Sequence, residues 1–134
     1  MTTLQPGVIG ESDLIVRESD TARSSGGESL PLVFSTPRMI SCMEQTAHAS
    51  IFPLLPEGQS SVGIVVNIRH LAATPVGMRV RFHSELLEVD GRRLRFKVEA
   101  WDEWEKIGEG EHERFVIDTA RFTDRLLKKI RPAE

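Results

Sequence analysis

The sequence predicts an α+β fold in which an antiparallel sheet wraps around one long central helix. Three observations indicate this fold: a long amphipathic helical segment follows residue 35, strand-like alternation dominates from residue 60 onward, and no second long helix interrupts these later segments. An antiparallel sheet with its helix on one face belongs to the α+β class. The 134 residues suffice for one core, so we expect a single domain over residues 1–134.

The long helix has clear start and stop signals. Threonine can cap a helix and proline favours its first position, so the helix is expected to open at Thr36 and Pro37. Pro53 and Pro56 are expected to end it near Phe52. At about 100° per residue, one arc of the helix collects the residues expected to be buried: Met39, Ile40, Met43, Ala47, Ser50 and Ile51.

The remaining segments alternate as strands do. We expect a first strand at Val8–Arg17 and another at Ser60–Ala73, whose apolar even positions 62, 64, 66 and 68 are predicted to face the core. Further strands are expected at Gly77–Glu88, Arg92–Trp101 and Lys106–Asp118, followed by a short amphipathic C-terminal helix.

The hairpin around Asp90 and Gly91 could form in two registers. A two-residue turn would place the apolar residues of its two strands on opposite faces. A three-residue loop with Gly91 in the left-handed conformation pairs Leu86 with Leu94 and keeps these residues on one face. We therefore predict the three-residue loop.

A polar segment, Glu18–Leu32, separates the first strand from the helix. Its composition predicts little buried surface, so we expect a loop of about 15 residues. Loops of this length are often lids over binding sites, although a merely mobile connection gives the same pattern.

Composition narrows the class of protein. The net charge of −3 argues against nucleic-acid binding, and no apolar run is long enough to cross a membrane. The segment Met1–Glu11 lacks the pattern of a secretory signal, and the single cysteine, Cys42, fits a reducing cytoplasm. Neither metal-ligand spacing nor a phosphate-binding glycine loop is present, so no metal or cofactor is expected.

Three side chains could carry chemistry: Thr36, Glu44 and His70. His70 continues the predicted core-facing alternation of its strand, and Glu44 lies at the margin of the buried helical stripe. A carboxylate in such a place can act as base or nucleophile, and a hydroxyl can position water or attack. Each residue also has a structural alternative: a hydrogen-bonded core histidine, a rim carboxylate and an ordinary helix cap.

Thr36 and Glu44 are eight residues apart, which is about 12 Å along a continuous helix. They therefore cannot touch within one chain unless the helix begins later. We favour a site shared between two subunits, which predicts a homodimer with two equivalent sites, and dimers that could pair into tetramers.

The order of strand, loop, helix and four strands is typical of a hotdog fold. Several stretches in this frame resemble the fluoroacetyl-CoA thioesterase family of hotdog proteins. They span most of the chain between residues 33 and 114: Val33–Thr36, Met43–Glu44, Gly63, His70–Pro75, Val89–Leu94 and Gly108–Arg114.

The resemblance implies hydrolysis of a short acyl-CoA thioester by Thr36, Glu44 and His70. Glu44 would be nucleophile or general base, Thr36 a hydroxyl partner and His70 a proton carrier. Two other functions fit the same residues: a hotdog protein that binds acyl-CoA without cleaving it, and a hotdog hydratase or dehydratase.

The resemblance also implies substrate-binding positions. Gly63 and Arg114 match positions that the family uses around the acyl group and coenzyme A, and Leu30 and Phe34 are expected nearby. The fluoroacetyl-specific enzyme has phenylalanines in its lid, where this chain has Gly27 and Leu30. We therefore expect another small acyl group, or an arylacyl group, as substrate.

The outer face of the hairpin carries five cations. They form either a solvated sheet face or a positive surface for the phosphates of coenzyme A. They are Arg79, Arg81, Arg93, Arg95 and Lys97.

Overall fold

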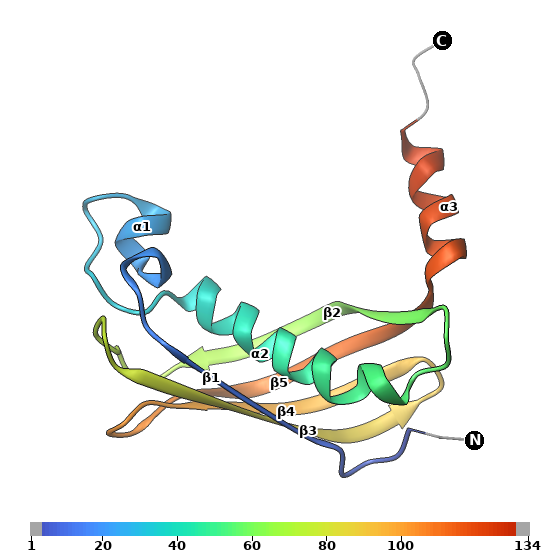
Figure 1. Ribbon diagram of the computed structural model, residues 1–134, viewed down its shortest axis with the longest axis horizontal. Coiled ribbons are helices and arrows are strands. Elements are labelled where there is room, and N and C mark those ends of the chain that lie inside the picture. Colours follow the sequence, from blue (N-terminus) through green and yellow to red (C-terminus); the bar gives the residue numbers. More distant parts are fainter. Residues whose placement is uncertain (1–3, 131–134) are drawn as a thin grey trace.

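The computed structural model describes residues 4–130, in which a five-stranded antiparallel sheet curves around helix α2, Thr36–Ile51 (Figure 1). The strand order is β1-β3-β4-β5-β2. The strands are β1 (Ile9–Ile15), β2 (Gln59–His70), β3 (Arg79–Asp90), β4 (Arg93–Trp101) and β5 (Lys106–Asp118). The predicted α+β arrangement of an antiparallel sheet around one long helix is confirmed.

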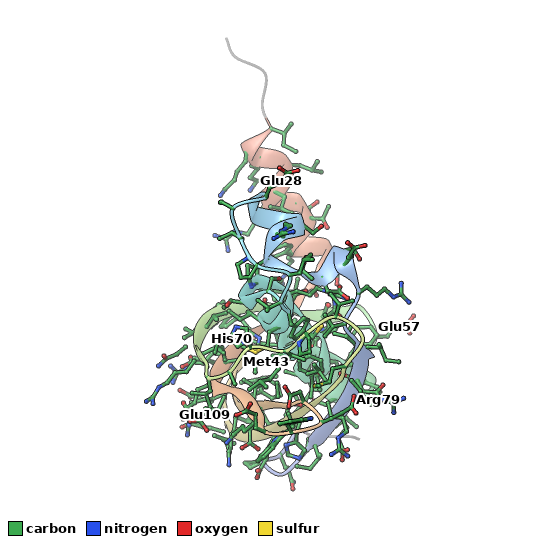
Figure 2. The ribbon with its side chains drawn as sticks, turned by 90° about the vertical axis from the view of Figure 1, so that its left-hand side faces the viewer. Glu28, Met43, Glu57, His70, Arg79 and Glu109 are labelled. Carbon is green, nitrogen blue, oxygen red and sulfur yellow. The ribbon has the colours of Figure 1, made fainter. Side chains whose placement is uncertain are left out.

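Helix α2 contacts all five strands through its apolar stripe. Met39, Met43, Ala47 and Ile51 are each at most 1% exposed, as their spacing predicts. Figure 2 shows Met43 at the centre of the molecule, with Arg79 and Glu109 at its periphery. Burying side chains of the size of Met43 stabilises the fold by roughly 1.5–3 kcal/mol each, so this stripe fixes how α2 lies on the sheet.

The cap of α2 differs from the prediction. Ser35, not Thr36, is the N-cap residue, and its hydroxyl accepts a hydrogen bond from the backbone N–H of Arg38. Thr36 is therefore the first helical residue, and its exposed side chain is free for another partner. The interpretation of Thr36 as an ordinary helix cap was wrong.

The predicted register of the β3–β4 hairpin was also wrong. Asp90 pairs with Arg93 around a two-residue turn, and Gly91 has the expected positive φ of 62°. A β-bulge at Leu87 then shifts the register, so Leu86 pairs with Phe96 rather than with Leu94. The bulge places the apolar residues of both strands on the core face. A three-residue loop is therefore not needed to bring them there.

Strand β2 does not bury the predicted apolar face within the chain. A register shift between Gly63 and Val65 interrupts its alternation, and β2 lies at the edge of the sheet. Ile64 and Val66, expected in the core, are 49% and 47% exposed, and Val65 is 40% exposed. The strand therefore presents apolar side chains to its surroundings.

The segment between β1 and α2 is more ordered than the predicted loop. It contains a 3-10 helix, η1 (Glu18–Asp20), and a short helix, α1 (Ala22–Gly26), which is followed by Gly27 with a φ of 107°. Asp20 is buried and forms a salt bridge of 3.0 Å with Arg38 of α2.

Two further helices complete the described residues. A 3-10 helix, η2 (Phe52–Leu54), follows α2, and α3 (Thr119–Lys129) follows β5 and projects from the sheet (Figure 1). None of the side chains of α3 is buried. Within residues 4–130, every helix is too short or too polar to cross a bilayer.

Candidate functional site

Thr36 and His70 meet at the N-terminal end of α2. Their Oγ1 and Nδ1 atoms are 2.7 Å apart, a hydrogen bond between the first residue of α2 and the last residue of β2. Figure 2 shows His70 nearer to the core than Glu109. The pair borders a pocket of about 390 Å³, which is lined by Ala22, Val33, Phe34, Ser35, Thr36, His70, Leu71, Ala72 and Ala73.

The environment of His70 favours a neutral imidazole. Burial lowers the pKa of His70, and the nearby backbone of Ala72 partly opposes this effect. Nε2 is buried and has no hydrogen-bond partner among residues 4–130. A neutral imidazole carries one proton and accepts another, so a base with one anchored nitrogen and one unused nitrogen can pass protons.

Glu44 lies elsewhere, in the middle of α2, and faces β2 and β5. Its Oε2 is 3.8 Å from Nη1 of Arg114 and 4.0 Å from Nε2 of His112. The Glu44 side chain is 36% exposed, whereas those of Arg114 and His112 are 9% and 1% exposed. A carboxylate is therefore held at the border between a buried cationic group and open space.

Gly63 forms the floor beneath this carboxylate. A Cβ atom at Gly63 would lie 2.7 Å from Oε2 of Glu44 and 3.2 Å from Cε1 of His112. Only a glycine leaves room for the carboxylate to rest against β2. The resemblance to the thioesterase family placed Gly63 near the acyl group, and the structure places it directly against Glu44.

Arg114 is anchored by three hydrogen bonds. Its Nε donates to Oγ of Ser61 at 2.7 Å, and Nη2 donates to the Ser61 carbonyl at 2.9 Å. Nη1 donates to Nε2 of His112 at 3.1 Å. Burial lowers the pKa of Arg114 and the Glu44 carboxylate raises it, so the guanidinium remains charged.

The network continues on both sides of Arg114. Nδ1 of His48 is 2.7 Å from the Ser61 hydroxyl, and Nδ1 of His112 is 2.8 Å from the Val65 carbonyl. Burial is the main cause that lowers the pKa of both histidines, and the positive charge of Arg114 lowers each further.

The structure thus forms two separate clusters along α2. Thr36 and His70 lie together at one end, whereas Glu44 joins Arg114 and Gly63 at the middle of the helix. Because α2 is continuous from residue 36 to residue 51, the alternative of a later helix start is excluded. The eight residues between Thr36 and Glu44 separate their backbones by about 12 Å.

Two other predicted binding residues lie apart from Glu44. Phe34 is 1% exposed and packs against Phe82, with ring centroids 6.3 Å apart, while also bordering the pocket beside Thr36. Leu30 is 38% exposed and does not border that pocket. The positive φ of Gly27 explains why an aromatic residue would be strained there.

The outer sheet face resembles a solvated ion-pair surface more than a phosphate site. Arg79 bonds Asp13, while Arg93 and Arg95 each bridge two carboxylates. Carboxylates that neutralise these cations reduce their attraction for phosphate.

Sequence reasoning missed three members of the Arg114 network: His48, Ser61 and His112. A usable signal existed for His112, since residues two apart in a strand share a face and Arg114 follows it by two. Among residues 4–130, no group of His, Cys, Asp or Glu side chains is arranged to hold a metal ion.

Comparison with known proteins identifies the family. Residues 16–120 match the family described as fluoroacetyl-CoA-specific thioesterase. The chain is 37% identical over 122 residues to the fluoroacetyl-CoA thioesterase of Streptantibioticus cattleyicolor, covering 87% of this chain and 88% of that protein.

Solved structures agree with this match. The chain superposes on the structure of a fluoroacetyl-CoA thioesterase with a TM-score of 0.89 and 33% identity, over 97% of this chain and 99% of the other. A thioesterase superfamily member from Thermus thermophilus gives a TM-score of 0.86 at 30% identity, over 97% and 95% of the two chains. The chain therefore belongs to the fluoroacetyl-CoA-specific thioesterase family of hotdog-fold enzymes.

Proposed function

We propose that this thioesterase hydrolyses a small acyl-CoA to the free acid and coenzyme A, at a site that two subunits share. Thr36 and His70 of one subunit would act with Glu44, Gly63 and Arg114 of the other. The observation that carries the proposal is the division of these groups into two clusters along a single continuous helix.

The exposed edge of β2 supports a dimer. Within residues 4–130, β2 pairs only with β5, so its other edge offers unpaired backbone groups beside the exposed Ile64, Val65 and Val66. A free apolar edge strand favours pairing with another strand, and a two-fold axis closes such a pair. A dimer formed through β2 would cover this edge.

The register of such a dimer would join the clusters. If β2 pairs antiparallel with its copy about an axis at Val66, then His70 lies four residues from the axis and faces Val62 of the partner subunit. Val62 adjoins Gly63, against which Glu44 rests. This pairing would bring Glu44 of one subunit toward the Thr36–His70 pair of the other.

The proposed reaction uses water as the second substrate. Glu44, as general base, takes a proton from water while the water oxygen adds to the thioester carbonyl. The C–S bond of the tetrahedral intermediate then breaks and the carbonyl re-forms as the acid. The leaving sulfur takes a proton from His70, and the proton that Glu44 removed from water then returns to His70, which restores both groups. Nε2 of His70 is buried, so this exchange is proposed at Nδ1, which is hydrogen-bonded to the exposed Thr36 hydroxyl.

A second route for Glu44 begins with attack by the carboxylate itself. It would form an acyl-enzyme anhydride that water then hydrolyses. In single-turnover hydrolysis in ¹⁸O-labelled water, ¹⁸O enters the Glu44 carboxylate when water attacks the Glu44 carbonyl of this anhydride. The general-base route never labels Glu44, so ¹⁸O in its carboxylate would identify the nucleophilic route.

The developing negative charge on the carbonyl oxygen needs donors. The N-terminus of α2 beside Thr36 and the backbone N–H groups near Gly63 are the candidates. Both kinds of donor stabilise oxyanions because they are held in place before the reaction begins.

The acyl group is proposed to be small or arylacyl, and different from fluoroacetyl. The short helix α1 and the segment to Leu30 form the proposed lid. Gly27 and Leu30 would enclose the acyl group less completely than aromatic side chains at these positions would. The lone and buried Cys42 supports a cytoplasmic location, and pairing of dimers into tetramers remains part of the proposal.

The test is release of free thiol from a panel of acyl-CoA thioesters that includes acetyl-, fluoroacetyl-, branched and arylacyl-CoA. We expect enzyme-dependent thiol release, with a best substrate other than fluoroacetyl-CoA. Binding of the same thioesters without thiol release would contradict hydrolysis and favour the binding-protein alternative. An enoyl-CoA and a hydroxyacyl-CoA are tested beside this panel, and loss of their double bond or hydroxyl without thiol release would favour the hydratase or dehydratase alternative.

A further inference from the structure

A continuous hydrogen-bonded chain lies behind Glu44. It runs from His48 of α2 through Ser61 of β2 to Arg114 of β5, and then through His112 to the Val65 carbonyl of β2. The family resemblance gave no role to His112, which is 1% exposed and cannot reach solvent.

The partners of His112 determine which of its nitrogens carries the proton. A carbonyl oxygen can only accept, so Nδ1 of His112 must donate to Val65. A guanidinium can only donate, so Nε2 must accept from Arg114. His112 is therefore a neutral imidazole with its proton on Nδ1.

This tautomer lets His112 fix the position of Nη1 of Arg114, because Nε2 accepts one of the two N–H groups of that nitrogen. Nη1 of Arg114 is 3.1 Å from Nε2 of His112 but 3.8 Å from Oε2 of Glu44. The two acceptors are 4.0 Å apart and cannot bond each other. A full arginine–carboxylate bond would be about 2.7–2.9 Å long, so Arg114 is held back from Glu44.

We propose that His112 is a positioning residue for the thioesterase reaction: it holds Arg114 away from a direct bond with Glu44. The carboxylate then stays beside a positive charge while its Oε2 remains available to a proton or a carbonyl carbon. This inference rests on the proposed role of Glu44, but the geometry of His112 can be tested without any activity.

The first test measures the side-chain ¹⁵N shifts of the histidines in the unaltered protein. We expect His112 with a protonated Nδ1 and an unprotonated Nε2 at neutral pH. A proton on Nε2 would overturn the inference, because that nitrogen could no longer accept from Arg114. This result is independent of thiol release, so it separates failure of the inference from failure of the proposed function.

The second test compares two substitutions that each keep one half of the histidine's bonding. In His112→Gln the side-chain oxygen can still accept from Arg114, whereas His112→Asn keeps a donor for Val65 and loses that acceptor. His83→Gln on β3, which takes no part in this network, is the matched control.

We expect His112→Asn to lower kcat by about 10-fold or more with little change in KM, and His112→Gln to stay within about 3-fold of the unaltered enzyme. An equal loss in both variants, or a larger loss in the glutamine variant, would overturn the inference. If the asparagine variant fails to fold, the ¹⁵N measurement decides.

Discussion

The two polar clusters along α2 differ in how firmly their side chains are held. Thr36 is exposed, and the imidazole of His70 is anchored by a single hydrogen bond that leaves Nε2 unused. Arg114 makes three hydrogen bonds, and His112 makes two, both within buried surroundings. The Thr36–His70 cluster is partly exposed and has a ring nitrogen without a hydrogen-bond partner among residues 4–130, whereas the side chains of Arg114 and His112 are buried and hydrogen-bonded.

This difference indicates a division of roles. A proton carrier needs access to the reacting atoms, and the exposed Thr36 hydroxyl beside Nδ1 of His70 fits this proposed role, because Nε2 is buried. An electrostatic support needs fixed geometry, which the Arg114 network provides. Glu44 lies at the boundary, since it is partly exposed and has only long contacts to its neighbours.

The largest expected effects come from removing the central group of each cluster. Glu44→Gln and His70→Ala should each lower turnover by at least about 100-fold, the usual scale for a positioned acid or base. Steady-state thiol release measures this, with Glu57→Gln and His83→Ala as matched controls on residues outside both clusters. Near-normal turnover in both folded variants would contradict the site assignment.

A methyl group at Gly63 should have the next largest effect. In Gly63→Ala the added Cβ would displace the Glu44 carboxylate, because it would lie 2.7 Å from Oε2. We expect kcat to fall by about 10- to 100-fold, as displacements near 1 Å do. In a Glu44→Gln background the same change should cost little more, and a full additional loss would show that Gly63 acts elsewhere.

The histidines predict a pH dependence of stability. Burial lowers the pKa values of His48, His70 and His112, so the unfolded chain binds more protons than the folded protein below about pH 6.5. Their contribution is complete above that pH and is lost as the pH falls toward the folded pKa values. Denaturant unfolding between about pH 5 and 8 should therefore show a free energy of unfolding that declines on acidification.

The variant His112→Gln sharpens this prediction. It removes one of the three titrating groups, so its free energy of unfolding should decline less steeply over the same range. An unchanged slope would show that His112 titrates alike in the folded and unfolded states.

The smallest expected effect concerns the proposed lid. Leu30→Phe should lower kcat/KM for the bulkier acyl groups by about 10-fold relative to acetyl-CoA, the scale of a small volume change in an apolar site. Leu32→Phe, two residues further along and similarly exposed, is the control. The same change in selectivity for both variants would argue against a specific role for Leu30.

Sequence patterns predicted the elements that follow a regular period. The limits of β5 at Lys106 and Asp118 and four buried residues of α2 were predicted correctly, because alternation and helical spacing are local. Ile40 and Ser50, also expected in the buried stripe, are only half-buried, whereas Cys42 and Thr46 are buried. The patterns failed at Leu87 and Ile64, where register shifts break the two-residue period. Such bulges depend on packing between strands, which a single sequence does not reveal.

The candidate site was only partly predictable for the same reason. The resemblance selected Thr36, Glu44 and His70, but the hydrogen bond between Thr36 and His70 depends on how the end of β2 meets the start of α2. The Arg114 network joins residues up to 53 positions apart, and no local pattern connects Ser61 with Arg114.

The central claim, a site shared between two subunits, can be tested by mixing two inactive variants. Glu44→Gln and His70→Ala subunits, unfolded and refolded together in equal amounts, would form half of their dimers with one chain of each kind. Each mixed dimer would hold one intact site, so the account predicts recovery of about a quarter of the normal activity. No recovery, with mixed dimers demonstrated in the sample, would show that each chain builds its site alone.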